Sequence, residues 1–173
     1  MKEQWELWVE DKARRDKDFL IYLKSKKVKK EGETQELIRG HLEKADHNLK
    51  FVQKTLDLQE FNDWAIVSTY YAIYHASLAL CALRGYSTKD HLATLLILIR
   101  EFYQRELNKE DLEMVNTSGI EKEHLLYYVE AKKERTKASY STQMLFNAED
   151  VEKLRKKAIT FVNKVKEIID AAK

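Results

Sequence analysis

Histidines are the residues of this sequence best suited to acid–base chemistry, because an imidazole titrates near neutral pH. The chain has five of them: His41, His47, His75, His91 and His124. His41 and His47 fall on a charged helix and are expected at its surface. None of the five forms the paired motif of a zinc protease, and no ExxH motif occurs on two separate helices as a di-iron bundle requires. The sequence therefore predicts no metal site and no cofactor.

His75 stands out by its setting, the almost wholly apolar run VSTYYAIYHASLALCALRGYS. On a helix, His75 and Tyr71 are four residues apart and share a face, with Ser68 and Tyr74 beside them. A histidine in such a helix must find a hydrogen-bond partner, because an unpaired buried polar group is costly. Two interpretations remain open: a buried structural network, or the polar lining of a site.

The segment YYVEAKKERTKASYS carries an arginine and a tyrosine that could face one phosphate. Arg135 falls on the last turns of a helix expected over 121–138, and Tyr140 follows where the chain can bend back toward the guanidinium. The guanidinium of arginine can bind a phosphodiester through two N–H donors. A tyrosine can donate its hydroxyl hydrogen to the same oxygens or stack on a base. In the alternative interpretation, the arginine pairs with Glu130 or Glu134 and the tyrosine only closes the turn.

Charge is dense but nearly balanced, with 31 lysines and arginines against 29 acidic residues. Bulk electrostatics therefore does not indicate a nucleic-acid binder. Two stretches are locally basic: KSKKVKK, Lys24 to Lys30, and the C-terminal KLRKKAITFVNKVKEIIDAAK. Each is either a solvated helix face with a charged end or a phosphate-binding patch.

The composition favours helices, since the chain has no proline and only four glycines. The spacing of apolar residues predicts the following helices: 3–27, 34–58, 63–83, 89–107, 121–138 and one from 147 to the C-terminus. The third is apolar all round and is expected at the centre. The predicted fold class is all-α, an up-and-down antiparallel bundle of about five core helices over 33–173 with an N-terminal helical extension over 1–32.

Particular residues are expected to begin and end these helices. Gly85 should end the central helix in a left-handed conformation. Ser87 or Thr88 should cap the next helix. Asn147 should open the last one, with Asp150 as the third residue of a capping box.

Other features exclude whole classes of protein. Cys81 is the only cysteine and lies in the most apolar part of the sequence, so it is expected to be a core residue and not part of a disulfide framework. The N-terminus is charged throughout, and the run LATLLILI is shorter than the roughly 20 residues of a membrane span. The four glycines are isolated, so no glycine-rich phosphate loop is present. We expect a soluble, cytoplasmic protein that does not contact membranes.

The stretch DWAIVSTYYAIYHASLALCALRGYSTKDH, followed later by ERTKASY, resembles the HEPN domain family. The shared features are a YYAxFHA-like helix, a glycine-ended turn with Lys-x-His at the next helix, and a late arginine with Ala-Asp-Tyr-like residues. The resemblance covers about Leu37 to Ile169. It implies a helical bundle that often dimerises, in a family that includes metal-independent RNases, frequently toxins partnered with a small nucleotidyltransferase.

The resemblance also points to individual site residues. The arginine of the RNase signature matches Arg135, but the place of its histidine falls on Tyr140. A tyrosine hydroxyl, with a pKa of about 10, is a poor base at neutral pH, so His75 or His91 would have to take that role. The candidate catalytic residues are Arg135, Tyr140 and His75, and the candidate substrate-binding residues are Tyr71, Lys89 and His91.

Three functions follow as hypotheses. The first is a HEPN homodimer that binds RNA or a nucleotide, as a component of a toxin–antitoxin system or beside a nucleotidyltransferase partner. The second is a metal-independent, toxin-like RNase. The third is a non-catalytic interaction module whose N-terminal helix docks a partner or a second protomer through Trp5 and Trp8.

Overall fold

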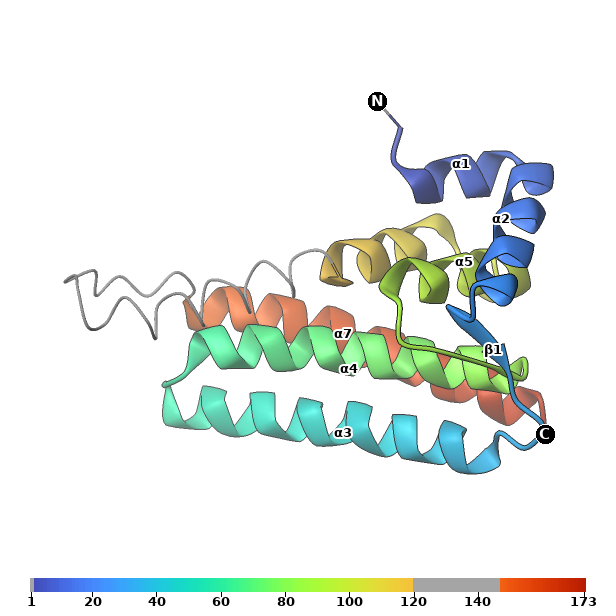
Figure 1. Ribbon diagram of the computed structural model, residues 1–173. Helices are drawn as coiled ribbons and strands as arrows, with labels where there is room; N and C mark the ends of the chain where they lie inside the picture. The colour runs from blue at the N-terminus through green and yellow to red at the C-terminus, as the bar shows by residue number, and fades with distance from the viewer. Residues whose placement is uncertain (1, 120–146) are drawn as a thin grey trace, which may run out of the picture.

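The computed structural model describes residues 2–119 and 147–173, and it confirms the all-α fold class (Figure 1). Its elements, in chain order, are α1 (Gln4–Glu10), α2 (Lys12–Lys24), β1 (Val28–Lys30), α3 (Gln35–Leu58), α4 (Asn62–Leu83), β2 (Tyr86–Thr88), α5 (His91–Glu101) and α7 (Ala148–Ala171). Residues 109–119 are also helical. The predicted helix over 121–138 lies outside the described residues.

α3, α4 and α7 pack side by side and form the body of the bundle (Figure 1). α3 and α4 are joined by a short turn and run antiparallel, as the short connection requires. α7 begins at the predicted Asn147, whose side chain accepts a hydrogen bond from the Asp150 N–H at 2.9 Å in the predicted capping box. Its apolar face is buried against the other two helices.

α4 is the central helix, as its all-round apolar sequence predicts. It contacts α3, α7, α5 and β2, and residues on nearly every side of it are buried. By length and composition alone α4 could cross a membrane, but 72% of its most apolar window is buried inside the described fold. This burial accounts for the apolar sequence, and the buried Cys81 is confirmed as a core residue.

The N-terminal residues pack onto this body through α5 (Figure 1). The single helix predicted over 3–27 is wrong, because Asp11 ends α1 and begins α2, where its carboxylate accepts a hydrogen bond from the Arg14 N–H at 3.0 Å. Trp5 and Trp8 are only 5% and 1% exposed. Neither tryptophan is therefore presented to a partner as the interaction-module hypothesis supposed.

β1 and β2 form an antiparallel ribbon that the sequence did not predict. Gly85 has a φ of 78° and ends α4 as predicted. Thr88 and Ser87, predicted as caps of the next helix, lie in β2 instead, and the cap of α5 is Asp90, whose carboxylate accepts a hydrogen bond from the Ala93 N–H at 2.9 Å. The ribbon links the N-terminal residues to the connection between α4 and α5.

Candidate functional site

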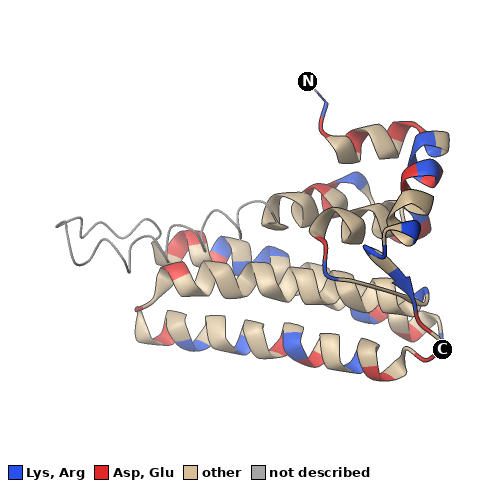
Figure 2. Ribbon diagram, viewed as in Figure 1, with Lys and Arg blue, Asp and Glu red and all other residues tan. Residues whose placement is uncertain are grey.

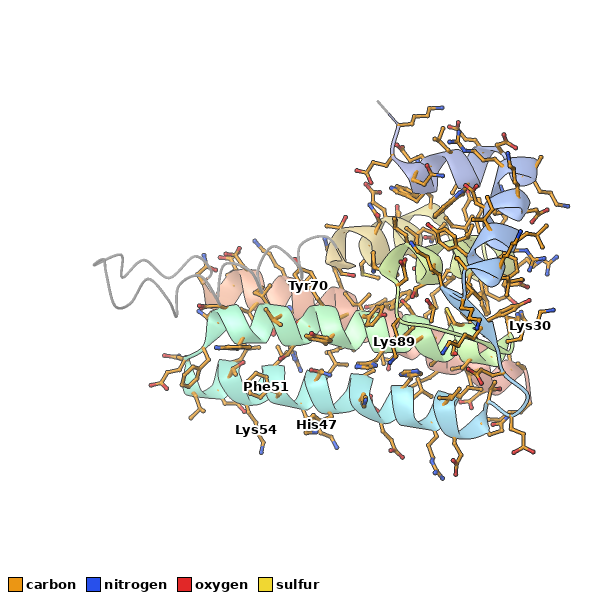
Figure 3. All side chains as sticks on the ribbon, viewed as in Figure 1. Lys30, His47, Phe51, Lys54, Tyr70 and Lys89 are labelled. Carbon is orange, nitrogen blue, oxygen red and sulfur yellow. The ribbon has the colours of Figure 1, made fainter. Side chains whose placement is uncertain are left out.

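The structure places four of the six predicted site residues. Tyr71 and His75 lie on α4, Lys89 lies in the turn between β2 and α5, and His91 is the first residue of α5. Figure 3 shows Lys89 on that turn, beside α4. Arg135 and Tyr140 lie outside the described residues.

His75 meets a histidine of α3 that the sequence analysis left at the surface. Nδ1 of His75 lies 3.1 Å from Nδ1 of His41, and the two rings stack with centroids 5.4 Å apart and planes inclined by 29°. A hydrogen bond between two such nitrogens needs a hydrogen on one and a lone pair on the other. The pair can therefore share one hydrogen across the contact between α3 and α4.

The two neighbouring tyrosines of α4 flank this histidine pair. The Tyr71 ring stacks on His75 with centroids 6.3 Å apart, as their predicted common face requires. Tyr74 lies between the imidazoles of His75 and His91, with centroid distances of 6.0 Å and 6.3 Å. Tyr74 thus connects His91 to the histidine pair through ring contacts.

Burial affects the protonation of two of these residues, His41 and Tyr74. Desolvation lowers the pKa of His41 below its usual value of 6.5, and the ammonium of Lys44 lowers it further. Desolvation raises the pKa of the Tyr74 hydroxyl above 10, against the opposing effect of a hydrogen bond with Thr94. At neutral pH His41 is therefore a neutral imidazole that can accept a proton, whereas Tyr74 keeps its hydroxyl hydrogen.

A cleft of about 910 Å³ opens beside the histidine pair. His41, Tyr74 and Leu78 form part of its wall, and the rest comes from the β1–β2 ribbon and the residues next to it. The charged residues of the wall are Lys26, Lys27, Lys29, Lys89, Glu31 and Asp90. Four lysines against two carboxylates leave two positive charges in excess, so the cleft favours an anionic ligand.

Hydrogen bonds fix the turn that carries Lys89. The Thr88 hydroxyl donates to the carbonyl of Lys27 at 2.7 Å, and the Asp90 N–H donates to the same hydroxyl at 3.0 Å. Lys27 forms an ion pair with Asp90 at 3.2 Å. Burial pushes the pKa of Asp90 upward, but hydrogen bonds from Ala93 and Lys27 outweigh it and hold that pKa below its usual value.

His91 has a structural environment different from that of the histidine pair. A Cβ atom added to Gly119 would lie 1.9 Å from Cε1 of His91, so this imidazole fills the space that glycine leaves free. His91 remains a predicted substrate-binding residue, and its ring contacts Tyr74 of the lysine-lined cleft.

The sequence analysis missed His41 because α3 is rich in charged residues. His47, assigned to the same surface, is exposed and points away from α4 (Figure 3). The available signal was spacing: Ile38, His41, Ala45 and Val52 follow one another at three, four and seven residues, which places them on one helical face. The other three are buried, so His41 belongs to the inner face of α3.

Comparison with known proteins gives two findings. A family model described as the HEPN domain matches residues 38–168. A protein of Methanocaldococcus jannaschii named "Putative toxin MJ0142" is 27% identical over 128 residues, which cover 74% of this chain and 78% of that protein. The family match includes the whole of α4, with His75, but begins after β1. The lysines of β1 and of the residues before it therefore lie outside the matched region.

Proposed function

We propose, on the premise that the chain belongs to the HEPN domain family, that this protein binds RNA in the cleft beside His41 and His75. The observation that carries the proposal is the contact of His75 with His41, an imidazole in the wall of a lysine-lined cleft. Lysines attract the phosphates of RNA, and aromatic rings can stack on its bases. The name of the archaeal relative supports a toxin-like role for such a protein.

The predicted residues have distinct roles in this proposal. Lys89 contacts phosphate, while Tyr71 and His75 support His41 through ring stacking. The guanidinium of Arg135 binds a phosphodiester through two N–H donors, and the Tyr140 hydroxyl donates to the same group. These last two roles rest on the sequence and the family resemblance.

Retention of a mixed RNA pool by the purified protein tests the binding function. The experiment is run at defined salt, because phosphate contacts are salt-dependent, and in EDTA. We expect retention by the natural chain and weaker retention by His41→Gln and Arg135→Ala. His47→Gln is the matched control, since it changes an exposed histidine of the same helix. Absence of retention by the natural chain would overturn the proposal.

A second function, metal-independent RNA cleavage, is favoured by the state of His41. Such cleavage needs a base that takes the proton of the 2′-hydroxyl and an acid that protonates the leaving 5′-oxygen. The lowered pKa of His41 keeps this imidazole neutral and able to act as the base. The adjacent imidazole of His75 can accept the Nδ1 hydrogen of His41 across the 3.1 Å contact while His41 holds the proton of the 2′-hydroxyl. When that hydrogen returns, His41 donates the proton it took to the leaving 5′-oxygen, so the step balances.

The same RNA incubation in EDTA tests this second function. The proposal predicts shortened RNA with the natural chain and intact RNA with His41→Gln, His75→Ala or Arg135→Ala. If the natural chain leaves the RNA intact but retains it, and this retention depends on Arg135, the cleavage function is rejected. The protein then only binds RNA, and any chemistry belongs to a partner.

The proposed partners are a second copy of the chain and a nucleotidyltransferase, and the proposed location is the cytoplasm. These proposals rest on the family resemblance. Light scattering on the full chain tests the homodimer, because it measures the mass in solution directly. A mass equal to that of one chain across the accessible concentrations would contradict it.

A further inference from the structure

One face of the β1–β2 ribbon carries most of the lysines of the cleft. Lys29 pairs with Ser87 and Val28 with Thr88. The backbone pairing continues at one end, where the Glu31 N–H donates to the carbonyl of Gly85 at 2.9 Å. At the other end the side-chain hydroxyl of Thr88 donates to the carbonyl of Lys27 at 2.7 Å.

Alternation along the strands then separates the side chains into two sets. Residues opposite each other share a face, and successive residues point to opposite faces. Continuing the register places Lys27 opposite Lys89, on the same face as Lys29 and Ser87. All four residues line the cleft, as the register requires.

The other face of the ribbon is structural. Val28 is 1% exposed, and the Tyr86 ring packs edge-on against Phe19 at a centroid distance of 5.3 Å. Lys30 belongs to this second face by alternation and does not line the cleft. A single basic run in the sequence is thus divided between a face that opens on the cleft and a face that packs on α2. Figure 2 shows the lysines of β1 in blue.

Three of the four cleft lysines are available to a ligand. Lys27 is engaged by Asp90 and its ammonium lies 5.0 Å from the Tyr22 ring centroid. Glu31 accepts a hydrogen bond from the Ser87 hydroxyl. Within residues 2–119 and 147–173, Lys26, Lys29 and Lys89 form no ion pair, and all three are exposed. Their charges are therefore not neutralised by the described fold.

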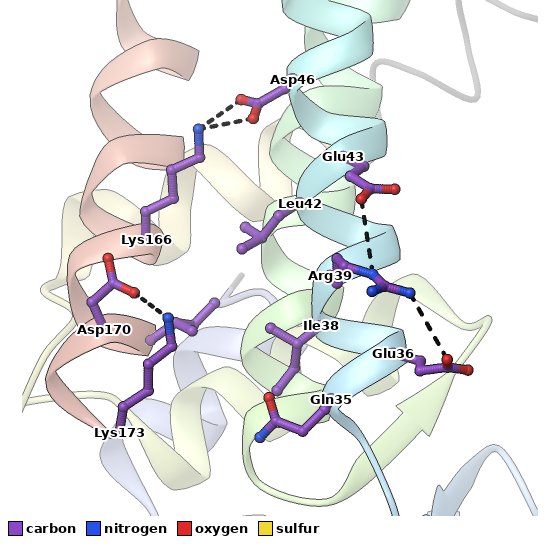
Figure 4. A pocket seen from close by; sticks show the side chains of 11 residues that line it. Gln35, Glu36, Ile38, Arg39, Leu42, Glu43, Asp46, Lys166, Asp170 and Lys173 are labelled. Carbon is purple, nitrogen blue, oxygen red and sulfur yellow. Dashed lines mark hydrogen bonds and ion pairs between the residues drawn. The ribbon is translucent and has the colours of Figure 1, made fainter.

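A second pocket of the molecule provides a contrast. It lies between α3 and α7, with a volume of about 560 Å³ (Figure 4). Lys166 bonds Asp46 at 2.7 Å, Lys173 bonds Asp170 at 2.6 Å, and Arg39 lies between two glutamates. Each cation of that pocket has an acidic partner. The pocket therefore attracts an anionic ligand less strongly than the cleft does.

The ligand must suit both the charge and the rings of the cleft. A positive groove that follows a phosphate backbone, combined with rings on which bases stack, is the composition of surfaces that bind single-stranded nucleic acid. The cleft combines its lysines with the rings of His41 and Tyr74. In a duplex the bases are paired and stacked within the helix and would not reach those rings.

From these observations we infer that the lysine face of the β1–β2 ribbon, Lys27, Lys29 and Lys89, binds the backbone of single-stranded RNA. The inference rests on the proposed RNA-binding function and deepens it. It makes β1 and the lysines before it, which lie outside the matched family region, part of the binding site. The substrate is then a strand of several nucleotides and not a mononucleotide.

The test compares two double variants of equal charge. Lys29→Gln with Lys89→Gln removes the two lysines of the ribbon's cleft face that form no ion pair within the described residues, and it keeps the pair of Lys27 with Asp90. Lys24→Gln with Lys30→Gln removes two lysines of the same basic run that do not line the cleft. Fluorescence anisotropy measures binding of a labelled single-stranded RNA of about 12 nucleotides, a length within the range that single-strand binding sites cover, over a series of salt concentrations.

Each phosphate contact with a single strand contributes about 0.7 to the slope of log K against log salt concentration. We expect the Lys29 and Lys89 variant to lower that slope by about 1.4, whereas the Lys24 and Lys30 variant keeps it. Circular dichroism confirms that both variants are folded. An unchanged slope in the first variant, or equal losses in both, overturns the inference while RNA binding itself stands.

Two further outcomes are decisive. No binding of RNA by the natural chain would overturn the proposed function and this inference with it. Equal affinity for a duplex of the same length, or for a mononucleotide, would overturn the single-strand assignment alone. The inference predicts that the single strand binds more tightly than either competitor.

Discussion

His41 and His75 are 34 positions apart in the sequence, yet their Nδ1 atoms lie 3.1 Å from each other across the contact of α3 and α4. One nitrogen must donate and the other accept. Protonation of both rings would remove the acceptor and place two positive charges in contact. This contact therefore ties the packing of two core helices to the protonation of the proposed site.

Stability should fall in mild acid because of His41. Its pKa is lowered in the folded chain by burial and by Lys44, so below about pH 6.5 the unfolded chain binds more protons than the native one. The free energy of unfolding then decreases as the pH falls and is fully retained above that value. Urea unfolding at about pH 7.5 and pH 5.5, within the range where histidine titrates, measures the decrease.

Replacing His41 should reduce this pH dependence. We expect a smaller difference between the two pH values in His41→Gln than in the natural chain. His47→Gln changes an exposed histidine of the same helix and should retain the full difference. Identical pH dependence in all three proteins would show that His41 does not contribute.

Two glycine substitutions should have opposite effects on stability. A Cβ at Gly119 would lie 1.9 Å from the His91 ring, so Gly119→Ala must displace that ring, at a cost of about 1–3 kcal/mol. Gly40 lies inside α3 with no atom within 4 Å of an added Cβ. Gly40→Ala should therefore stabilise the chain by about 0.5–1 kcal/mol. Chemical denaturation measures both, and a stabilised Gly119→Ala would contradict the described packing of His91.

The N-terminal helices should contribute to the stability of the whole fold. Trp8 is 1% exposed and its indole N–H donates to Asp18 at 2.7 Å. We expect Trp8→Ala to lower the free energy of unfolding by about 3–5 kcal/mol. Leu20→Ala, on the 65% exposed leucine of α2, should change it by less than about 0.5 kcal/mol. A loss in the leucine variant as large as in the tryptophan variant would refute this assignment.

Cys81 should be unreactive in the native protein. Its side chain is completely buried, and burial raises the pKa of the thiol far above its usual range, so the reactive thiolate is scarce. A thiol-specific reagent should modify it only after denaturation. Modification of the native chain as fast as that of the unfolded chain would show that the core around α4 opens readily.

The main helices could be predicted from the sequence because their signals are local. α3 and α4 begin and end within a residue or so of the predicted bounds, and the Asn147 capping box opens α7 as predicted. The division of the N-terminal helix was missed because its break is an aspartate cap at Asp11 and not a proline or glycine.

The cleft could not be predicted because its parts meet only in the folded chain. Each strand of the ribbon has three residues, too few for a pattern, and β1 pairs with a strand far along the sequence. The one sign in the sequence was a single apolar residue, Val28, within a run of lysines. The His41 to His75 contact depends on how α3 and α4 pack, which residue types alone do not specify.

The location of bound RNA shows whether the lysine-lined cleft beside His41 is the binding site. Photo-crosslinking of a single-stranded RNA to the full natural chain, followed by mass spectrometry of the peptides, identifies the residues in contact. We expect crosslinks to the peptides that contain Lys27 and Lys29, His41, and Tyr74 or Lys89. Crosslinks confined to the basic face of α7, or none at all, would contradict this assignment.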